Sequence, residues 1–127
     1  MAMYAQTSGT HSTTSGTFEA IPGLSITIPE GVGAMAIVIL NLPQPYSTGN
    51  NYPGGVFRVS IDGKVNDVEA SFTYSEQNPP GSGRVPTTLL VGVPLGPKLQ
   101  VIQGLWHGVR GSKVIIDSPA TLTAILD

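Results

Sequence analysis

Short runs of apolar and polar residues alternate along most of this chain, with turn residues between them. Residues 24–28 alternate strictly, which is typical of a strand with one buried face. Residues 35–40 are continuously apolar and predict a strand that is covered on both faces. The run at 56–61 leads into Asp62-Gly63, a dipeptide that strongly favours a hairpin turn. Together these patterns predict an all-β chain.

The remaining strand-like runs continue this series at a regular spacing. They lie at residues 69–74, 87–93, 98–106, 113–116 and 121–126. No window has the caps and the amphipathic period of a useful helix. About eight strands at this spacing favour a β-sandwich or barrel, and we expect an all-β jelly-roll β-sandwich.

The N-terminal segment differs from the rest in composition. Residues 1–16 are rich in Ser, Thr and Gly, which predicts a flexible arm ahead of a single jelly-roll domain at 17–127. The segment lacks the basic start and the apolar stretch of a signal peptide, which leaves cytoplasmic residence or non-classical export. No apolar run approaches the roughly 18 residues that span a bilayer, so we expect no membrane insertion.

Two long loops, at residues 42–55 and 75–86, interrupt the strands, and their prolines favour a preformed surface. Only 11% of residues are charged, yet Arg84 and Arg110 both lie beside glycine and serine. A guanidinium suits bidentate bonding to oxygens, and glycine permits close approach. This combination indicates an oxygen-rich ligand, neutral or anionic. The net charge of −2 provides no basic field for nucleic acid.

The sequence offers few residues from which a catalytic site could be built. It has no cysteine and only two histidines, too few for the ligand set of a metal-dependent oxygenase. A hydrolase would have to use His107 with Ser112 and Asp117, without a nucleophile elbow. Glu69 and Glu76, the candidate glycosidase pair, would lie about 23 Å apart along an extended strand. We expect no enzyme, no metal and no cofactor, with a small hydrolase as the least favoured alternative.

The loops and strand ends carry side chains that suit sugars. Hydroxyl and guanidinium groups bond vicinal hydroxyls, and aromatic rings cover the apolar face of a sugar. The candidates are Tyr46, Tyr52, Thr73, Tyr74, Ser82, Arg84, Trp106 and Arg110. Two other interpretations stay open: Trp106 is an ordinary core residue, and Arg110 is an ion-pair partner of Asp117.

The first loop and several shorter motifs resemble a known lectin family. Residues 38–54, with the run Pro-Tyr-Ser-Thr-Gly-Asn-Asn, resemble the N-terminal domain of a Burkholderia superlectin. The resemblance continues through 72–75, 83–86, 109–112 and 116–118, and covers most of residues 18–125. That family consists of fucose-binding lectin domains with a tumour-necrosis-factor-like jelly-roll fold that form homotrimers. The resemblance therefore implies fucosylated glycans as partners and a role in bacterial adhesion.

In that family each sugar site lies between neighbouring protomers. The resemblance implies that one protomer contributes Tyr46, Ser82 and Arg84, and that its neighbour contributes Thr73, Tyr74 and Arg110. Three positions depart from the family pattern: Val56 replaces a tyrosine, Gly81 a serine and Ser82 a threonine. The lost hydroxyls predict retained fucose binding with an altered preference among larger glycans. The alternative is a trimeric structural or protein-interaction module of the same fold that binds no sugar.

Overall fold

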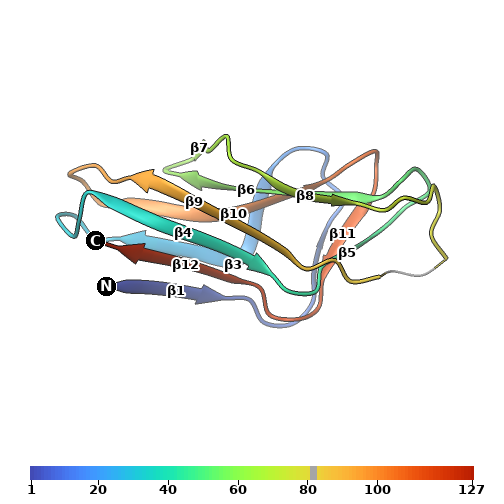
Figure 1. Ribbon diagram of the computed structural model, residues 1–127, viewed down its shortest axis with the longest axis horizontal. Coiled ribbons are helices and arrows are strands. Elements are labelled where there is room, and N and C mark those ends of the chain that lie inside the picture. Colours follow the sequence, from blue (N-terminus) through green and yellow to red (C-terminus); the bar gives the residue numbers. More distant parts are fainter. Residues whose placement is uncertain (81–82) are drawn as a thin grey trace.

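The computed structural model describes residues 1–80 and 83–127, and its strands pack as a β-sandwich (Figure 1). The strands of these residues are β1 (Ala2–Gln6), β2 (His11–Thr13), β3 (Glu19–Ile28), β4 (Met35–Leu42), β5 (Tyr46–Thr48), β6 (Gly54–Ile61), β7 (Lys64–Val65), β8 (Ala70–Thr73), β9 (Thr87–Pro94), β10 (Gln100–Gly108), β11 (Lys113–Ile116) and β12 (Thr121–Leu126).

Two larger sheets form the layers of the sandwich. One has the strand order β1-β12-β4-β9, and the other has the order β3-β10-β6-β7, with β8 also paired to β6. A small third sheet, β2-β11-β5, lies toward the end at which the two long loops emerge (Figure 1). Neighbouring strands pair antiparallel, and many of the pairs are far apart in sequence. The predicted all-β jelly-roll sandwich is confirmed.

The core lies between the two larger sheets, and alternation along the strands fills it. In β9 every second residue, including Leu89, Val91 and Val93, is buried. Trp106 belongs to this core, as the simpler interpretation of that residue expects, and so does Phe72. Each buried side chain of this size contributes about 1.5–3 kcal/mol through removal of apolar surface from water.

Strand β4 departs from its prediction. Its residues alternate between buried positions, such as Val38, and less buried ones: Met35 is 47% exposed, and Ile37 and Ile39 are half-buried. The prediction that residues 35–40 are covered on both faces is therefore wrong for the isolated chain. The reason is that β4 lies inside a sheet with only one face on the core, so its apolar run also points outward.

The turn predicted at Asp62-Gly63 forms as expected. Ile61 pairs with Lys64 across a two-residue connection between β6 and β7. Asp62 and Gly63 have φ values of 50° and 82°. Positive φ at both central residues is the geometry of a type I′ turn, and Asp-Gly suits it.

In place of the flexible arm expected at residues 1–16, the structure has two paired strands. β1 pairs with β12 along five residues, and β2 pairs with β11. Thr7 fixes the crossing between them, because its amide donates to the Ala120 carbonyl and its hydroxyl accepts from the Ala120 amide, both at 2.9 Å. The composition of residues 1–16 predicted mobility. The open edges of β11 and β12 supply hydrogen-bond partners for this segment, and these partners are not visible in the local sequence.

Candidate functional site

The two long loops are bonded to one another at one end of the sandwich. The Tyr52 amide donates to the Gln77 carbonyl at 3.0 Å, and the Val85 amide donates to the Pro45 carbonyl at 3.0 Å. These bonds join loop 42–55 to loop 75–86, so the two form one surface. Ser82, a predicted site residue, and its neighbour Gly81 lie outside the described residues.

Arg84 is held between a carboxylate and an aromatic ring. Its Nη1 and Nη2 donate to the two carboxylate oxygens of Asp117 at 3.0 and 2.9 Å. Its guanidinium carbon lies 4.0 Å from the centre of the Tyr46 ring. β5 pairs with β11, so the strand that carries Tyr46 lies beside the strand that precedes Asp117. We call Tyr46, Arg84 and Asp117 the Arg84 group.

The Arg84 group is oriented and close to neutral. The side chains of Arg84 and Asp117 are 39% and 32% exposed, and an ion pair this accessible contributes at most about 1 kcal/mol to stability. Its main effect is therefore geometric, because bidentate pairing fixes the plane of the guanidinium. Since the carboxylate cancels the charge of the guanidinium, the group suits hydroxyls better than anions.

Arg110 is held by a tight turn and by main-chain oxygens. Arg110 and Gly111 have φ values of 50° and 75°, and the Ser112 amide donates to the Val109 carbonyl at 3.0 Å, which closes a type I′-like turn. We call residues 109–112 the Arg110 turn. The Arg110 Nε donates to the carbonyls of Asn51 and Tyr52 at 2.9 and 3.1 Å.

Arg110 forms no ion pair with any described residue. The alternative in which it pairs with Asp117 is wrong, because Asp117 accepts both of its charged hydrogen bonds from Arg84. Arg110 therefore keeps its charge near the surface, with the direction of its fork fixed by carbonyls of the first loop.

Thr73 and Tyr74 follow one another along the chain but project to different places. Thr73 is exposed at the end of β8, opposite Gly54, whose carbonyl accepts from the Val109 amide of the Arg110 turn. The Tyr74 hydroxyl donates to the Gly83 carbonyl at 2.6 Å and accepts from the Ser47 amide at 3.1 Å. Thr73 thus lies near the Arg110 turn, whereas the polar end of Tyr74 ties β5 to the second loop.

Beside these residues the surface is hollowed. A cavity of about 280 Å³ is lined by Tyr74, Ser75, Glu76, Pro79, Pro80 and Gly83. Two prolines, Pro79 and Pro80, form part of its wall.

Ser112 is a residue of this region that the sequence analysis did not identify as a positioning group. It is only 2% exposed. Its Oγ lies 3.0 Å from the Gly54 carbonyl oxygen and 2.6 Å from the Val109 carbonyl oxygen, so its single proton can be donated to either one. The same oxygen accepts from the amides of Gly54 and Val109 at 3.3 and 3.2 Å. The Ser112 hydroxyl therefore locks the Arg110 turn onto the start of β6. A serine directly after Arg-Gly is too common a pattern to signal this.

Val56, the position at which the family pattern has a tyrosine, is 7% exposed. It lies on β6 between Ser71 of β8 and His107 of β10. A valine there contacts strand neighbours rather than the loop surface. Val56 is therefore on a strand that pairs directly with β8, the strand that ends at Thr73.

The residues of the hydrolase alternative are each bonded elsewhere. The His107 ring packs edge-on against Phe18 at 4.5 Å between ring centres, and its Nδ1 is 2.8 Å from the Gly108 carbonyl. Ser112 bonds main-chain groups and Asp117 bonds Arg84. No cluster of metal-ligating side chains occurs among residues 1–80 and 83–127. The same residues include no helix of a length and apolarity that would cross a membrane.

The fold and the loop surface define a class: a jelly-roll domain with preformed, aromatic and guanidinium-bearing loops at one end. Within that class the chain belongs to the Bc2l-C N-terminal domain family, whose family model matches residues 2–125. The resemblance seen in the sequence is confirmed at the level of the family. The match also includes most of the segment expected to be an arm. No curated protein matches the chain.

Solved structures are similar to this chain at low sequence identity. A chain of dimeric latent PorU from Porphyromonas gingivalis matches 99% of this chain with a TM-score of 0.60 and 11% identity, and this chain spans 12% of its length. The CBM36-1 domain of a multidomain xylanase from the hindgut metagenome of Trinervitermes trinervoides matches 100% of this chain over 98% of its own, with a TM-score of 0.50 and 16% identity. Eiger TNF from S. frugiperda matches 99% of this chain over 92% of its own, with a TM-score of 0.41 and 5% identity.

Proposed function

We propose that this protein is a lectin that binds fucose and fucosylated glycans without catalysis, at sites between the protomers of a homotrimer. Family membership supports a carbohydrate-binding role. The observation that carries the proposal is the pair of oriented guanidinium groups on one loop surface. A sugar offers vicinal hydroxyls to such donors and a C–H face to a ring such as Tyr46.

The residues divide between two protomers in this proposal. One protomer contributes Tyr46, Ser82 and Arg84, and its neighbour contributes Thr73, Tyr74 and Arg110. The two arginines are held by different residues, Arg84 by Asp117 and Arg110 by the carbonyls of Asn51 and Tyr52, which is compatible with this division. Each guanidinium hydrogen bond to a sugar hydroxyl is worth roughly 1.5–3 kcal/mol.

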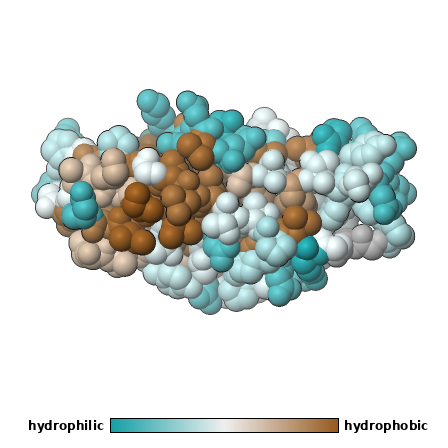
Figure 2. All heavy atoms as spheres, viewed as in Figure 1, coloured by the Kyte–Doolittle hydropathy of each residue, from teal (hydrophilic) through white to brown (hydrophobic). Residues whose placement is uncertain are grey.

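The sheet β1-β12-β4-β9 supports self-association. Its outer face has large apolar side chains where an antiparallel sheet facing water usually has polar ones. Figure 2 shows them as a brown patch over β4, β9 and β12. This apolar face consists of Tyr4, Met35, Ile37, Ile39, Leu90 and Ile125. A patch of this kind marks a protein contact, and we assign it to the trimer.

The sugar site is tested with Arg110→Ala on immobilised fucose. We expect loss of retention with the oligomer unchanged, because the substitution removes a charged donor from an exposed turn. Arg58→Ala is the matched control, since Arg58 lies on β6, forms an ion pair with Glu69 and is outside the proposed site. Retention of the Arg110→Ala protein on fucose would contradict the proposed site.

The trimer is tested by light scattering after size exclusion. The proposal predicts three times the 13.2 kDa chain mass and a smaller species for Leu90→Lys, which adds a charge to the apolar face. A monomeric wild-type protein would exclude a site between protomers. The apolar face also favours the alternative function, a trimeric structural module without sugar binding. A stable trimer that binds nothing on a glycan array would support that alternative.

A further inference from the structure

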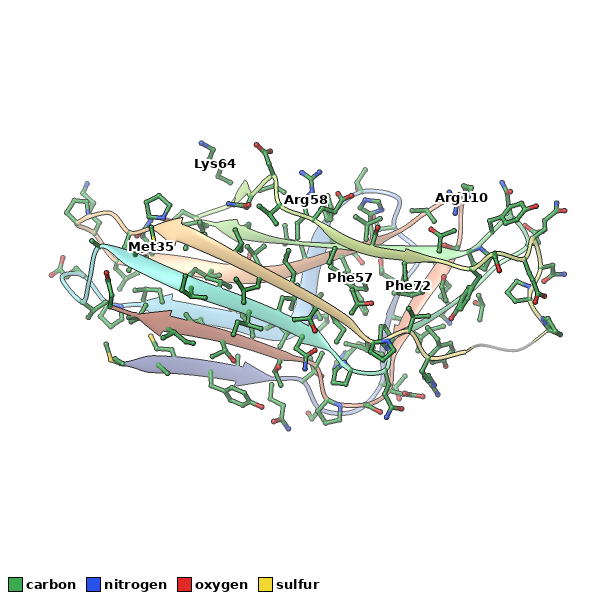
Figure 3. The ribbon with its side chains drawn as sticks, viewed as in Figure 1. Met35, Phe57, Arg58, Lys64, Phe72 and Arg110 are labelled. Atoms are coloured by element: carbon green, nitrogen blue, oxygen red, sulfur yellow. The ribbon has the colours of Figure 1, made fainter. Side chains whose placement is uncertain are left out.

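A second cavity lies away from the long loops, between the β6–β7 hairpin and the ends of β9 and β10. Its volume is about 310 Å³ and its lining includes Asp62, Lys64, Asn66 and Gln100. Figure 3 shows Lys64 and Arg110 toward different ends of the sandwich. The cavity therefore shares no residue with the proposed fucose site.

Three of its polar side chains are fixed in the same way. Each uses one oxygen to accept a hydrogen bond from a main-chain amide, and this leaves its other terminal atom free. The bonds run from the Val101 amide to Asp62 Oδ1 at 2.8 Å, from the Val68 amide to Asn66 Oδ1 at 2.9 Å, and from the Gly96 amide to Gln100 Oε1 at 2.8 Å. Anchoring of this kind reduces the rotamer entropy that binding would otherwise cost.

The free atoms form a set of mixed polarity. Asp62 Oδ2 is an acceptor, and the Asn66 Nδ2 and Gln100 Nε2 amide groups are donors. None of these three atoms has a side-chain hydrogen bond among the residues that the structure describes. Hydroxyl groups, which both donate and accept, satisfy such a set better than an anion or a cation does.

The charge and the size of the cavity restrict the class of ligand further. Asp62 and Lys64 bring opposite charges to the lining, so the cavity carries no net formal charge. Ile61, Val65 and Pro94 supply apolar wall against which the C–H face of a ring can lie. A volume of about 310 Å³ is at the small end of ligand pockets. The size therefore suits a single ring rather than an extended oligosaccharide.

We propose that this cavity is a second binding site, for a neutral polyhydroxylated ligand the size of one sugar ring. The site does not depend on the long loops. It gives each chain a contact for a sugar unit at the end of the sandwich opposite the long loops.

The test is a two-dimensional amide NMR titration in the Arg110→Ala background, in which the loop site is disabled. D-Galactose, D-glucose and D-mannose are added separately, up to about 100 mM, which covers millimolar affinities. We expect at least one sugar to shift the amides of Val68, Gly96 and Val101 in a saturable way. The signals of these amides should respond to binding in the cavity, because the amides donate to the three anchored side chains.

Two substitutions then remove the free donors, and a third controls for the negative charge that each of them adds. Asn66→Asp and Gln100→Glu keep the anchoring oxygen and replace the free amide group with an oxygen, so each should raise the dissociation constant about fivefold or more. Gln103→Glu adds the same charge on β10 without lining the cavity and should leave the constant unchanged. The proposal is overturned if no sugar shifts these amides, or if both variants bind as the Gln103→Glu control does. Either result leaves the fucose site untouched.

Discussion

Arg84 and Arg110 come from similar glycine- and serine-containing segments, yet the protein holds them in different ways. A carboxylate and an aromatic ring hold Arg84. Main-chain carbonyls at Asn51 and Tyr52 hold Arg110. A carboxylate cancels the positive charge, whereas a carbonyl orients the guanidinium and leaves the charge in place. The same residue type therefore provides a neutral, fixed fork in one group and a charged donor in the other.

The two supports also differ in depth. The Arg84 group rests on exposed side chains, so its geometry depends on contacts that water can replace. The Arg110 turn rests on Ser112 and Gly54, which are buried. Substitutions beneath Arg110 should therefore lower the stability of the whole fold. Substitutions around Arg84 should mainly change ligand binding.

The largest effect is expected for Gly54→Ala. A Cβ at this position would overlap the Phe72 carbonyl oxygen and press on Thr73. Because the overlapping atom is main chain, the strands must separate, and we expect a loss of about 3 kcal/mol or more in the free energy of unfolding. Chemical denaturation measures it. Gly16→Ala, where nothing lies within 4 Å, is the control; equal stability of the two variants would contradict the buried support.

Ser112→Ala should have an intermediate effect. It leaves the Gly54 and Val109 main-chain groups without their hydroxyl partner, at a cost of about 1–3 kcal/mol in stability. Fucose retention should fall with it, since the Arg110 turn loosens. Thermal unfolding and affinity chromatography measure the two effects. Ser12→Ala, at an exposed position of β2, should change neither, and a Ser112→Ala protein that matches it would remove Ser112 from the support.

The smallest effect on stability is expected for Asp117→Asn. Loss of this exposed ion pair should change the free energy of unfolding by at most about 1 kcal/mol. The charge of Arg84 is then uncompensated, so affinity for a sulfated fucoside should rise roughly threefold relative to fucose at low salt. Competition assays measure the ratio. Glu69→Gln breaks the other ion pair, with Arg58, and should leave the ratio unchanged; the same ratio in both variants would contradict a neutral Arg84 group.

The sequence predicted those parts of the fold that depend on local patterns. The hairpin at Asp62-Gly63 and the alternating strand at 24–28 follow from turn chemistry and period-two burial. The strands β1 and β2 were not predicted, because a Ser- and Thr-rich segment becomes a strand only when an open edge is available. The exposure of the outward apolar residues of β4 was missed for a similar reason. Whether the outer face of a strand is covered depends on which other elements pack against it, and a local pattern does not show this.

The sequence indicated which residues belong to the candidate site better than it indicated how they are arranged. The loops and the two arginines were identified from the residues, but the partner of Arg84 depends on the register of β5 with β11. That register brings Asp117 to Arg84 and away from Arg110. The support by Ser112 also depends on non-local contacts, with a residue 58 positions away in sequence. Sequence spacing carries no signal of either contact.

The central claim is that one sugar site needs Arg84 of one protomer and Arg110 of the next. Mixing Arg84→Ala and Arg110→Ala chains, after joint refolding, tests it most directly. Neither homotrimer should bind fucose, while each mixed trimer should regain one intact site, which amounts to about one quarter of the wild-type sites for random mixing of a cyclic trimer. Isothermal titration with fucose counts these sites. Mixed trimers that bind no fucose, although mass spectrometry shows both chains in them, would contradict a site shared between protomers.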